Sequence, residues 1–349
     1  MRYWERTGRD AEGLAQFVDR GLMMGHPAQV SSGAFSSPAA CDWDGDWDGD
    51  WDLLIGNEMG FVHLCENVGT KERPVFEPGK PLKTVDGAVL RIMREDILHD
   101  ADSERYCGQT KVVFADWDRD GLPDLILGNN TNRIFFCKNV GKLHQPQFTQ
   151  PVAIKVEGVA DPFGWRFRPS VVDWDGDGLP DLVAVSPEGV ICLFRRYRDA
   201  STSALKCSAG APLIFEDGRT ITAKRADPDS YPPSQHRLNT SMFVDVCDWN
   251  GNGKWDLIVT CGWHINYLEN VGDNAQPRFR DPVPLSTPDG PIRHISRPEL
   301  PPCVVDWNGD GRLDLLVGGE SGFVYFFDRR CLDGKMGTAE VGAVEVKKR

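Results

Sequence analysis

The sequence lacks three features that would place it in familiar classes of protein. It contains no apolar run long enough to cross a membrane, and no apolar stretch of the signal-peptide kind follows its first residues. It has no excess of basic residues, since its net charge is −13, which argues against a nucleic-acid partner. It also lacks the CxxC or Cys/His spacing of a zinc site.

The ten cysteines could in principle form an extracellular disulfide framework. Their positions favour another interpretation, because most of them recur at equivalent places. Cys41 and Cys247 directly precede an Asp-Trp pair, and Cys303 lies three residues before one. We therefore expect small buried side chains that fill equivalent core sites.

A repeated acidic loop dominates what is present. Its clearest copy begins at Asp173 and reads Asp-Trp-Asp-Gly-Asp-Gly-Leu-Pro-Asp. Carboxylates alternate along it, Gly178 permits a positive φ, and Asp181 returns from the far side of the turn. Calcium takes about six to eight oxygen ligands at about 2.3–2.6 Å. The loop therefore predicts a Ca²⁺ site and suits Mg²⁺ less well. A single Asp-Gly cluster would usually be only a solvated turn, so the repetition of the loop favours the metal site.

Five copies predict up to five Ca²⁺ ions. The expected ligands are Asp44, Asp46, Asp48, Asp52, Asp116, Asp118, Asp120, Asp124, Asp173, Asp175, Asp177, Asp181, Asp248, Asn250, Asn252, Asp256, Asp306, Asn308, Asp310 and Asp314. The first copy is two residues longer, so two registers compete. Counting back from Asp52 places Trp43 before the loop. In the fourth copy, two amides weaken the field at the ion.

The net charge agrees with this interpretation. Nineteen of the 52 acidic residues lie in the five loops, and five Ca²⁺ ions would leave a net charge of about −3. The acidity is therefore explained by a metal requirement.

The pattern D-x-D-x-D-G-x-x-D-L, followed by a short apolar strand and a glycine, resembles the FG-GAP / VCBS repeats of β-propellers, including those of integrin α-chains. The resemblance covers residues 17–327. It implies a propeller fold and leaves the function open, because such propellers occur in adhesins, lectin-like modules and polysaccharide lyases.

The repeat predicts an all-β fold of four-stranded blades. In the second full repeat we expect strands at 111–117, 124–127, 133–139 and 147–154. The last Asp of each loop recurs every 65.5 residues on average, which predicts five blades, with part of a six- or seven-bladed ring as the alternative. We expect one domain over residues 1–330, closed by pairing of residues 16–22 with the last blade, a charged tail over 331–349, and a monomer.

The Trp that follows the first Asp in four loops could stack on a sugar, but its fixed place favours packing between blades. The connections from each fourth strand to the next blade are long and vary, and in propellers that face commonly carries the ligand. We expect ligand contacts on this face from Arg105, Tyr106, Trp165, Arg168, His236, Arg237, His294 and Arg297 of these connections, and from Trp263 and His264 of a connection between the second and third strands of a blade.

These residues suit an acidic glycan, since Arg can hold a uronate carboxylate in a bidentate manner. We expect a glycan- or protein-binding module. The alternative is a polysaccharide lyase or glycoside hydrolase, with His236, His294, Tyr106, Arg168 and Arg297 as catalytic candidates. Ordinary loop surface is the third interpretation of the same residues. Calcium modules of this kind usually act outside the cell, so we expect an extracellular or periplasmic protein, although the sequence shows no signal peptide.

Overall fold

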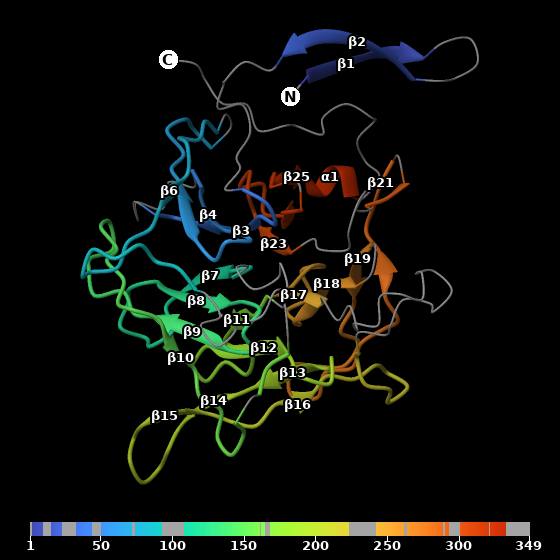
Figure 1. Ribbon diagram of the computed structural model, residues 1–349. Coiled ribbons are helices and arrows are strands. Elements are labelled where there is room, and N and C mark those ends of the chain that lie inside the picture. Colours follow the sequence, from blue (N-terminus) through green and yellow to red (C-terminus); the bar gives the residue numbers. More distant parts are fainter. Residues whose placement is uncertain are drawn as a thin grey trace, which may run out of the picture.

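The protein is a five-bladed β-propeller, as the repeats predict (Figure 1). The computed structural model describes residues 2–9, 15–22, 33–43, 50–71, 74–92, 108–160, 162–164, 168–222, 242–261, 264–288, 290–292, 301–320 and 322–332. Within these residues, helix is confined to α1 (Arg329–Leu332). No helix among them is both long and apolar enough to span a bilayer.

Each blade is an antiparallel sheet whose strands follow one another in chain order. The first blade contains β3 (Ser37–Cys41), β4 (Asp52–Gly56), β5 (Val62–Cys65) and β6 (Lys80–Pro81), and the second contains β7 (Lys111–Ala115), β8 (Asp124–Gly128), β9 (Ile134–Cys137) and β10 (Val152–Ala153). The third contains β11 (Ser170–Val172), β12 (Asp181–Val185), β13 (Ile191–Phe194) and β16 (Ala211–Pro212). The fourth contains β17 (Met242–Cys247), β18 (Asp256–Cys261), β19 (His264–Leu268) and β20 (Val283–Pro284), and the fifth contains β23 (Pro302–Val305), β24 (Asp314–Val317) and β25 (Tyr325–Phe327).

Three hairpins lie outside the blades. The third blade carries an inserted hairpin of β14 (Arg196–Arg198) and β15 (Leu205–Cys207). The fourth is followed by β21 (Ser286–Thr287) and β22 (Gly290–Pro291). Near the N-terminus, β1 (Arg2–Arg9) pairs with β2 (Ala15–Leu22).

The predicted strands of the second blade agree with β7, β8 and β9, but the fourth strand is shorter than expected. It was predicted over residues 147–154 and reduces to Val152–Ala153. Pro151 has no N–H to donate to a ladder. Phe148 instead makes isolated bridges, one to Asn139 and a parallel one to Thr84 of the first blade.

The closure of the ring differs from the predicted pairing. β2 is paired with β1 in a sheet of its own, which lies apart from the blades in Figure 1, and the last blade has three strands among the described residues. A hairpin between neighbouring segments closes a far shorter loop than a pairing across the whole chain, so its entropic cost is lower. The fifth blade instead meets the first through Ser36, whose N–H donates to Gly319 O at 3.0 Å. The predicted tail begins within α1, and its residues 333–349 lie outside the described part.

The hydrophobic core lies between blades. One cluster joins Leu54 and Val62 of the first blade to Leu125 of the second. Other clusters join the second, third and fourth blades, the fourth and fifth, and the fifth and first. Each blade therefore buries its faces against both neighbours, which is why a ring is more stable than an open array.

The loop tryptophans belong to this packing, as predicted. Trp117, Trp174, Trp249 and Trp307 are at most 6% exposed, so none is available to stack on a sugar. Each packs on the blade that follows it. Trp307 lies 6.2 Å from the ring of Phe76, and Arg196 stacks over Trp117 at 4.0 Å.

The cysteine interpretation is also confirmed for the residues that the structure describes. Eight cysteines are free thiols, and seven of these are buried. Cys247 and Cys303 lie in clusters between blades.

Candidate metal loops and the binding face

The second to fifth loops, each between the first and second strands of its blade, are held by similar backbone hydrogen bonds. In the second loop, Asp116 accepts the N–H groups of Asp120 and Gly121, both at 3.1 Å. Asp120 in turn accepts the N–H of Leu122 at 3.0 Å. Gly121 has a φ of 92°, a conformation that costs glycine little.

The third, fourth and fifth loops repeat these contacts. Their first residues, Asp173, Asp248 and Asp306, each accept two backbone N–H groups at 2.7–3.1 Å. The loop sequence therefore builds its own turn, and the carboxylates are placed by the backbone that they cap.

Two loops bring three carboxylates together. Asp116, Asp118 and Asp120 each offer an oxygen within 4.8 Å of the others, and so do Asp173, Asp175 and Asp177. Oxygens about 2.4 Å from one ion can be at most about 5 Å apart. Each group can therefore surround a single divalent ion. The Asp118 Oδ1 atom is buried and accepts no hydrogen bond, which leaves it available as a ligand.

A cationic side chain approaches each of these two groups. The Lys138 Nζ atom contacts Asp118 and lies 2.6 Å from Asp120 Oδ2. Arg195 holds the equivalent place in the third blade and contacts Asp175. The hydrogen bond from Lys138 lowers the pKa of Asp120. These side chains neutralise part of the acidic charge and share the oxygens that an ion would use.

The last Asp of the loop accepts hydrogen bonds from two backbone N–H groups, a role that the sequence pattern did not reveal. Asp124 Oδ2 accepts the N–H of Trp117 at 2.9 Å, and its Oδ1 accepts the N–H of Asn139 at 2.7 Å. Asp181 and Asp314 make the same pair of bonds in their blades. Burial raises the pKa of all three to about 6, while the N–H bonds act in the opposite direction. These residues tie the loop to the turn after the third strand, and they lie outside the two groups of converging carboxylates.

The described ends of the first loop fix the place of Trp43 in the repeat. The Trp43 N–H donates to Asp52 Oδ2 at 3.2 Å, as Trp117 does to Asp124. Cys41 pairs with Asp52, as Ala115 pairs with Asp124. Trp43 is therefore the equivalent of Trp117 and belongs inside the loop, contrary to the register counted back from Asp52. The predicted ligands Asp44, Asp46 and Asp48 lie outside the described residues.

Most of the residues predicted to bind a ligand also lie outside the described part of the chain. They are Arg105, Tyr106, Trp165, His236, Arg237, Trp263, His294 and Arg297. His264 is described, is half-buried at the start of β19, and has a buried Nδ1 atom without a hydrogen-bond partner.

Arg168 is the described member of both the catalytic and the ligand-binding sets, and it is 4% exposed. Its Nη1 atom lies 3.1 Å from Asp245 Oδ1. Asp245 also accepts Ser170 Oγ at 3.0 Å and the N–H of Val304 at 2.9 Å. This ion pair links residues of three blades in the interior of the protein. Arg168 is therefore not placed to hold the carboxylate of a ligand at the surface.

A family model for the FG-GAP-like repeat matches residues 116–184 and 248–317, which contain four of the five loops. None of the curated proteins matches the chain. Among solved structures, a lectin from Agrocybe aegerita, described as recognising non-reducing terminal N-acetylglucosamine, has 19% identity and a TM-score of 0.40. The similarity covers 85% of this chain, which spans 63% of the lectin's length. A chain of the crystal structure of BBS1N in complex with ARL6DN has 13% identity and a TM-score of 0.35, with 88% of this chain and 83% of that chain covered. Similarities this low carry no argument about a ligand.

Proposed function

We propose, from the premise that this chain is a protein of FG-GAP-like repeats, that it is a calcium-stabilised propeller serving as a glycan- or protein-binding module. The observation that carries the metal part is the convergence of three carboxylate oxygens within 4.8 Å in each of two loops. The oxygens of these residues are the ligands that calcium prefers.

The position of the loops suggests what calcium does. Each loop joins the first two strands of its blade, and its Trp packs on the next blade. An ion that fixes the loop therefore also fixes the contact between two blades. When bound, calcium would be held by Asp116, Asp118 and Asp120 in the second blade and by Asp173, Asp175 and Asp177 in the third, and it would supply positive charge that offsets their mutual repulsion.

A stiff ring suits a binding module. The connections between blades then form a face whose residues can vary without affecting the packing. We propose that this face binds the ligand and that the protein works where calcium is abundant, outside the cell or in the periplasm. Within the described residues, Arg168 supports no catalytic role, since it is buried against Asp245.

The test is calcium binding by the intact protein. Titration calorimetry and native mass spectrometry should find bound Ca²⁺, and EDTA should lower the melting temperature. The double variant Asp175→Asn and Asp177→Asn should lose one ion per chain and part of the calcium-dependent rise in melting temperature. A matched control is Asp217→Asn and Asp281→Asn, two exposed acids away from the loops that pair with Arg219.

The proposal fails if calcium changes neither the mass nor the melting temperature, or if the control pair reduces calcium binding as much as the loop pair does. Mg²⁺ at the same concentration should give a smaller effect, because it demands near-ideal octahedral geometry.

A further inference from the structure

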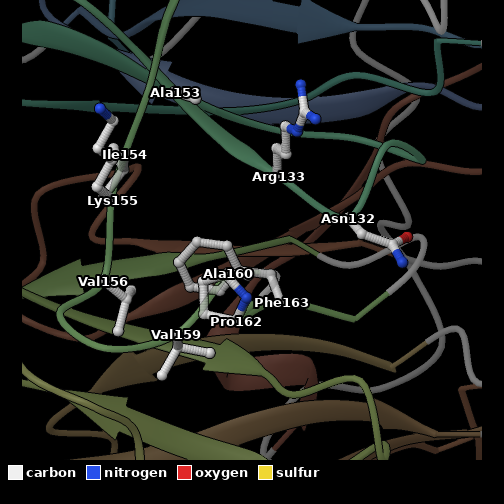
Figure 2. A pocket seen from close by; sticks show the side chains of 10 residues that line it. All are labelled: Asn132, Arg133, Ala153, Ile154, Lys155, Val156, Val159, Ala160, Pro162 and Phe163. Atoms are coloured by element: carbon white, nitrogen blue, oxygen red, sulfur yellow. The ribbon is translucent and has the colours of Figure 1, made fainter. Parts of the chain in front are cut away.

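One pocket of the second and third blades combines a cavity with cationic side chains. It has a volume of about 370 Å³ and is shown in Figure 2. Its lining comes from the turn before β9, from the end of β10, and from the connection that leads to β11. The lining residues are Asn132, Arg133, Ala153, Ile154, Lys155, Val156, Val159, Ala160, Pro162 and Phe163.

The floor of this pocket is apolar and rigid. Phe163 is fully buried and packs edge-on against Phe194, with 5.2 Å between ring centroids. Val156 is 5% exposed and is bridged to Val159 across a tight turn. Both buried residues belong to the cluster shared by the second, third and fourth blades. The floor therefore exists before any ligand arrives, which lowers the entropic cost of binding.

The two charged side chains among these lining residues are positive. Arg133 and Lys155 are exposed, and Figure 2 shows their charged ends on either side of the space above Pro162 and Phe163. Within the described part of the chain, neither side chain has an ion pair or a hydrogen bond. The neighbouring acid Glu157 is engaged elsewhere, since it contacts Tyr197 and lies 3.2 Å from Lys206 Nζ.

Two cations without ion pairs among the described residues therefore face one apolar floor, which suits an anionic ligand with an apolar face. Asn132 has a φ of 60°, a left-handed conformation that non-glycine residues seldom adopt. It places an amide at the same pocket and adds a donor for an anion.

We propose that this pocket binds a small carboxylate ligand of the size and class of a uronic acid sugar. Arg133 takes the carboxylate, Lys155 lies across the pocket as a second cation, and the apolar floor contacts one face of the ring. The volume is at the lower end of the range for small-molecule sites, about 300–1,000 Å³, which fits one or two sugar rings. The inference rests on the proposed binding function and assigns it a ligand class and a place.

The test uses the full chain with calcium present and measures binding of glucuronate and galacturonate by titration calorimetry and ligand-observed NMR. Glucose is the neutral control. The wild type should bind the uronates and not glucose, and its affinity should fall as ionic strength rises. Arg133→Ala should weaken binding at least tenfold, since a hydrogen bond to a charged group contributes about 1.5–3 kcal/mol. Arg133→Lys should recover only part of the loss, because Lys cannot make the bidentate contact.

Lys142→Ala is the matched control, because Lys142 is an exposed lysine of the same blade in the turn on the opposite face. It should leave binding unchanged. Asp161, which adjoins Pro162 in sequence, lies outside the described residues, and Asp161→Asn should maintain or increase the affinity.

The inference is overturned if no uronate binds, or if Arg133→Ala and Lys155→Ala together leave the affinity unchanged in a variant that melts at the wild-type temperature. Calcium titration of the same samples separates this failure from that of the proposed function. Calcium binding with retained glycan or protein binding elsewhere would remove only the pocket.

Discussion

Replacing Lys138 by Met should change calcium affinity and apo stability in opposite directions. The Lys138 ammonium lies 2.6 Å from Asp120 Oδ2 and also contacts Asp118, so it shares oxygens with the proposed ion. An ion about 2.4 Å from Asp120 Oδ2 could be no more than about 5 Å from that ammonium. With the dielectric constant of water, the repulsion between a divalent and a monovalent cation at about 5 Å is about 1.7 kcal/mol.

This repulsion corresponds to a change of roughly 17-fold in affinity, and a lower local dielectric would increase it. Lys138→Met should therefore strengthen calcium binding at the second loop by at least about tenfold. Without calcium the same variant loses its ion pairs, which are partly exposed and contribute about 0.2–1 kcal/mol each. Its melting temperature in EDTA should fall.

The assay is a pair of melting curves, one with EDTA and one with saturating calcium, together with calorimetric affinities. Lys142→Met, in the same blade but away from the loop, is the control for loss of a surface lysine. A Lys138→Met protein with unchanged calcium affinity and an unchanged melting temperature in EDTA would refute the idea that the ammonium and the ion compete.

Three further predictions concern the left-handed loop residue, the buried Arg168–Asp245 pair and the buried cysteines. Arg119 has a φ of 65° where the other described loops have glycine at φ values of 67–75°. Arg119→Gly should raise the free energy of unfolding, measured by urea titration, by about 0.5 kcal/mol, because relief of left-handed strain exceeds the entropic cost of glycine. Gly176→Ala should lower the free energy of unfolding by about 1 kcal/mol. Arg168→Ala should destabilise the protein by about 3–5 kcal/mol, because it leaves the Asp245 carboxylate buried without its cation. Adding Asp245→Ala should restore part of this loss. A fully stable Arg168→Ala protein would contradict the structural role. Burial raises the pKa of Cys65 and Cys137 to about 12, so both should resist alkylation at pH 8 until denaturant is added. The partly exposed Cys331 should react before either of them when labelling is mapped by mass spectrometry.

The sequence predicted the blades well because each repeat contains its own signals. The acidic turn, the Trp within it and the apolar strand after it all lie within about a dozen residues, and local patterns of this kind decide strand order. The closure of the ring could not be predicted in the same way. It depends on whether pairing of residues 16–22 with a distant blade is more favourable in free energy than pairing with β1. The local sequence of either segment does not reveal which pairing is more stable.

The role of Arg168 was missed for a related reason. A position before a strand in a long connection indicates exposure, yet Arg168 reaches inward to Asp245, 77 positions further along the chain. The pocket with Arg133 and Lys155 was missed because its lining combines the turn before β9 with the end of β10 and the connection that leads to β11, about 20 residues further along the chain. The two cations carry no motif that distinguishes them from solvated surface residues.

Charge across the blade also changes how the loops should be ranked as metal sites. Judged by the loop alone, Asn250 and Asn252 make the fourth copy weaker than the second and third. The residue that follows the third strand of each blade alters this comparison. Lys138 and Arg195 hold this position in the second and third blades and contact the carboxylates of their loops. The same position holds Glu269 in the fourth blade and Asp328 in the fifth. These two acids pair with Arg280 and Arg330 instead. An ion entering the second or third loop must therefore displace or tolerate a cation, and one entering the fourth meets two neutral amides without that competitor. The affinities of the loops should consequently differ by less than their Asp content suggests, and Lys138→Met should restore the lead of the second loop over the fourth, while the third loop keeps its competing Arg195.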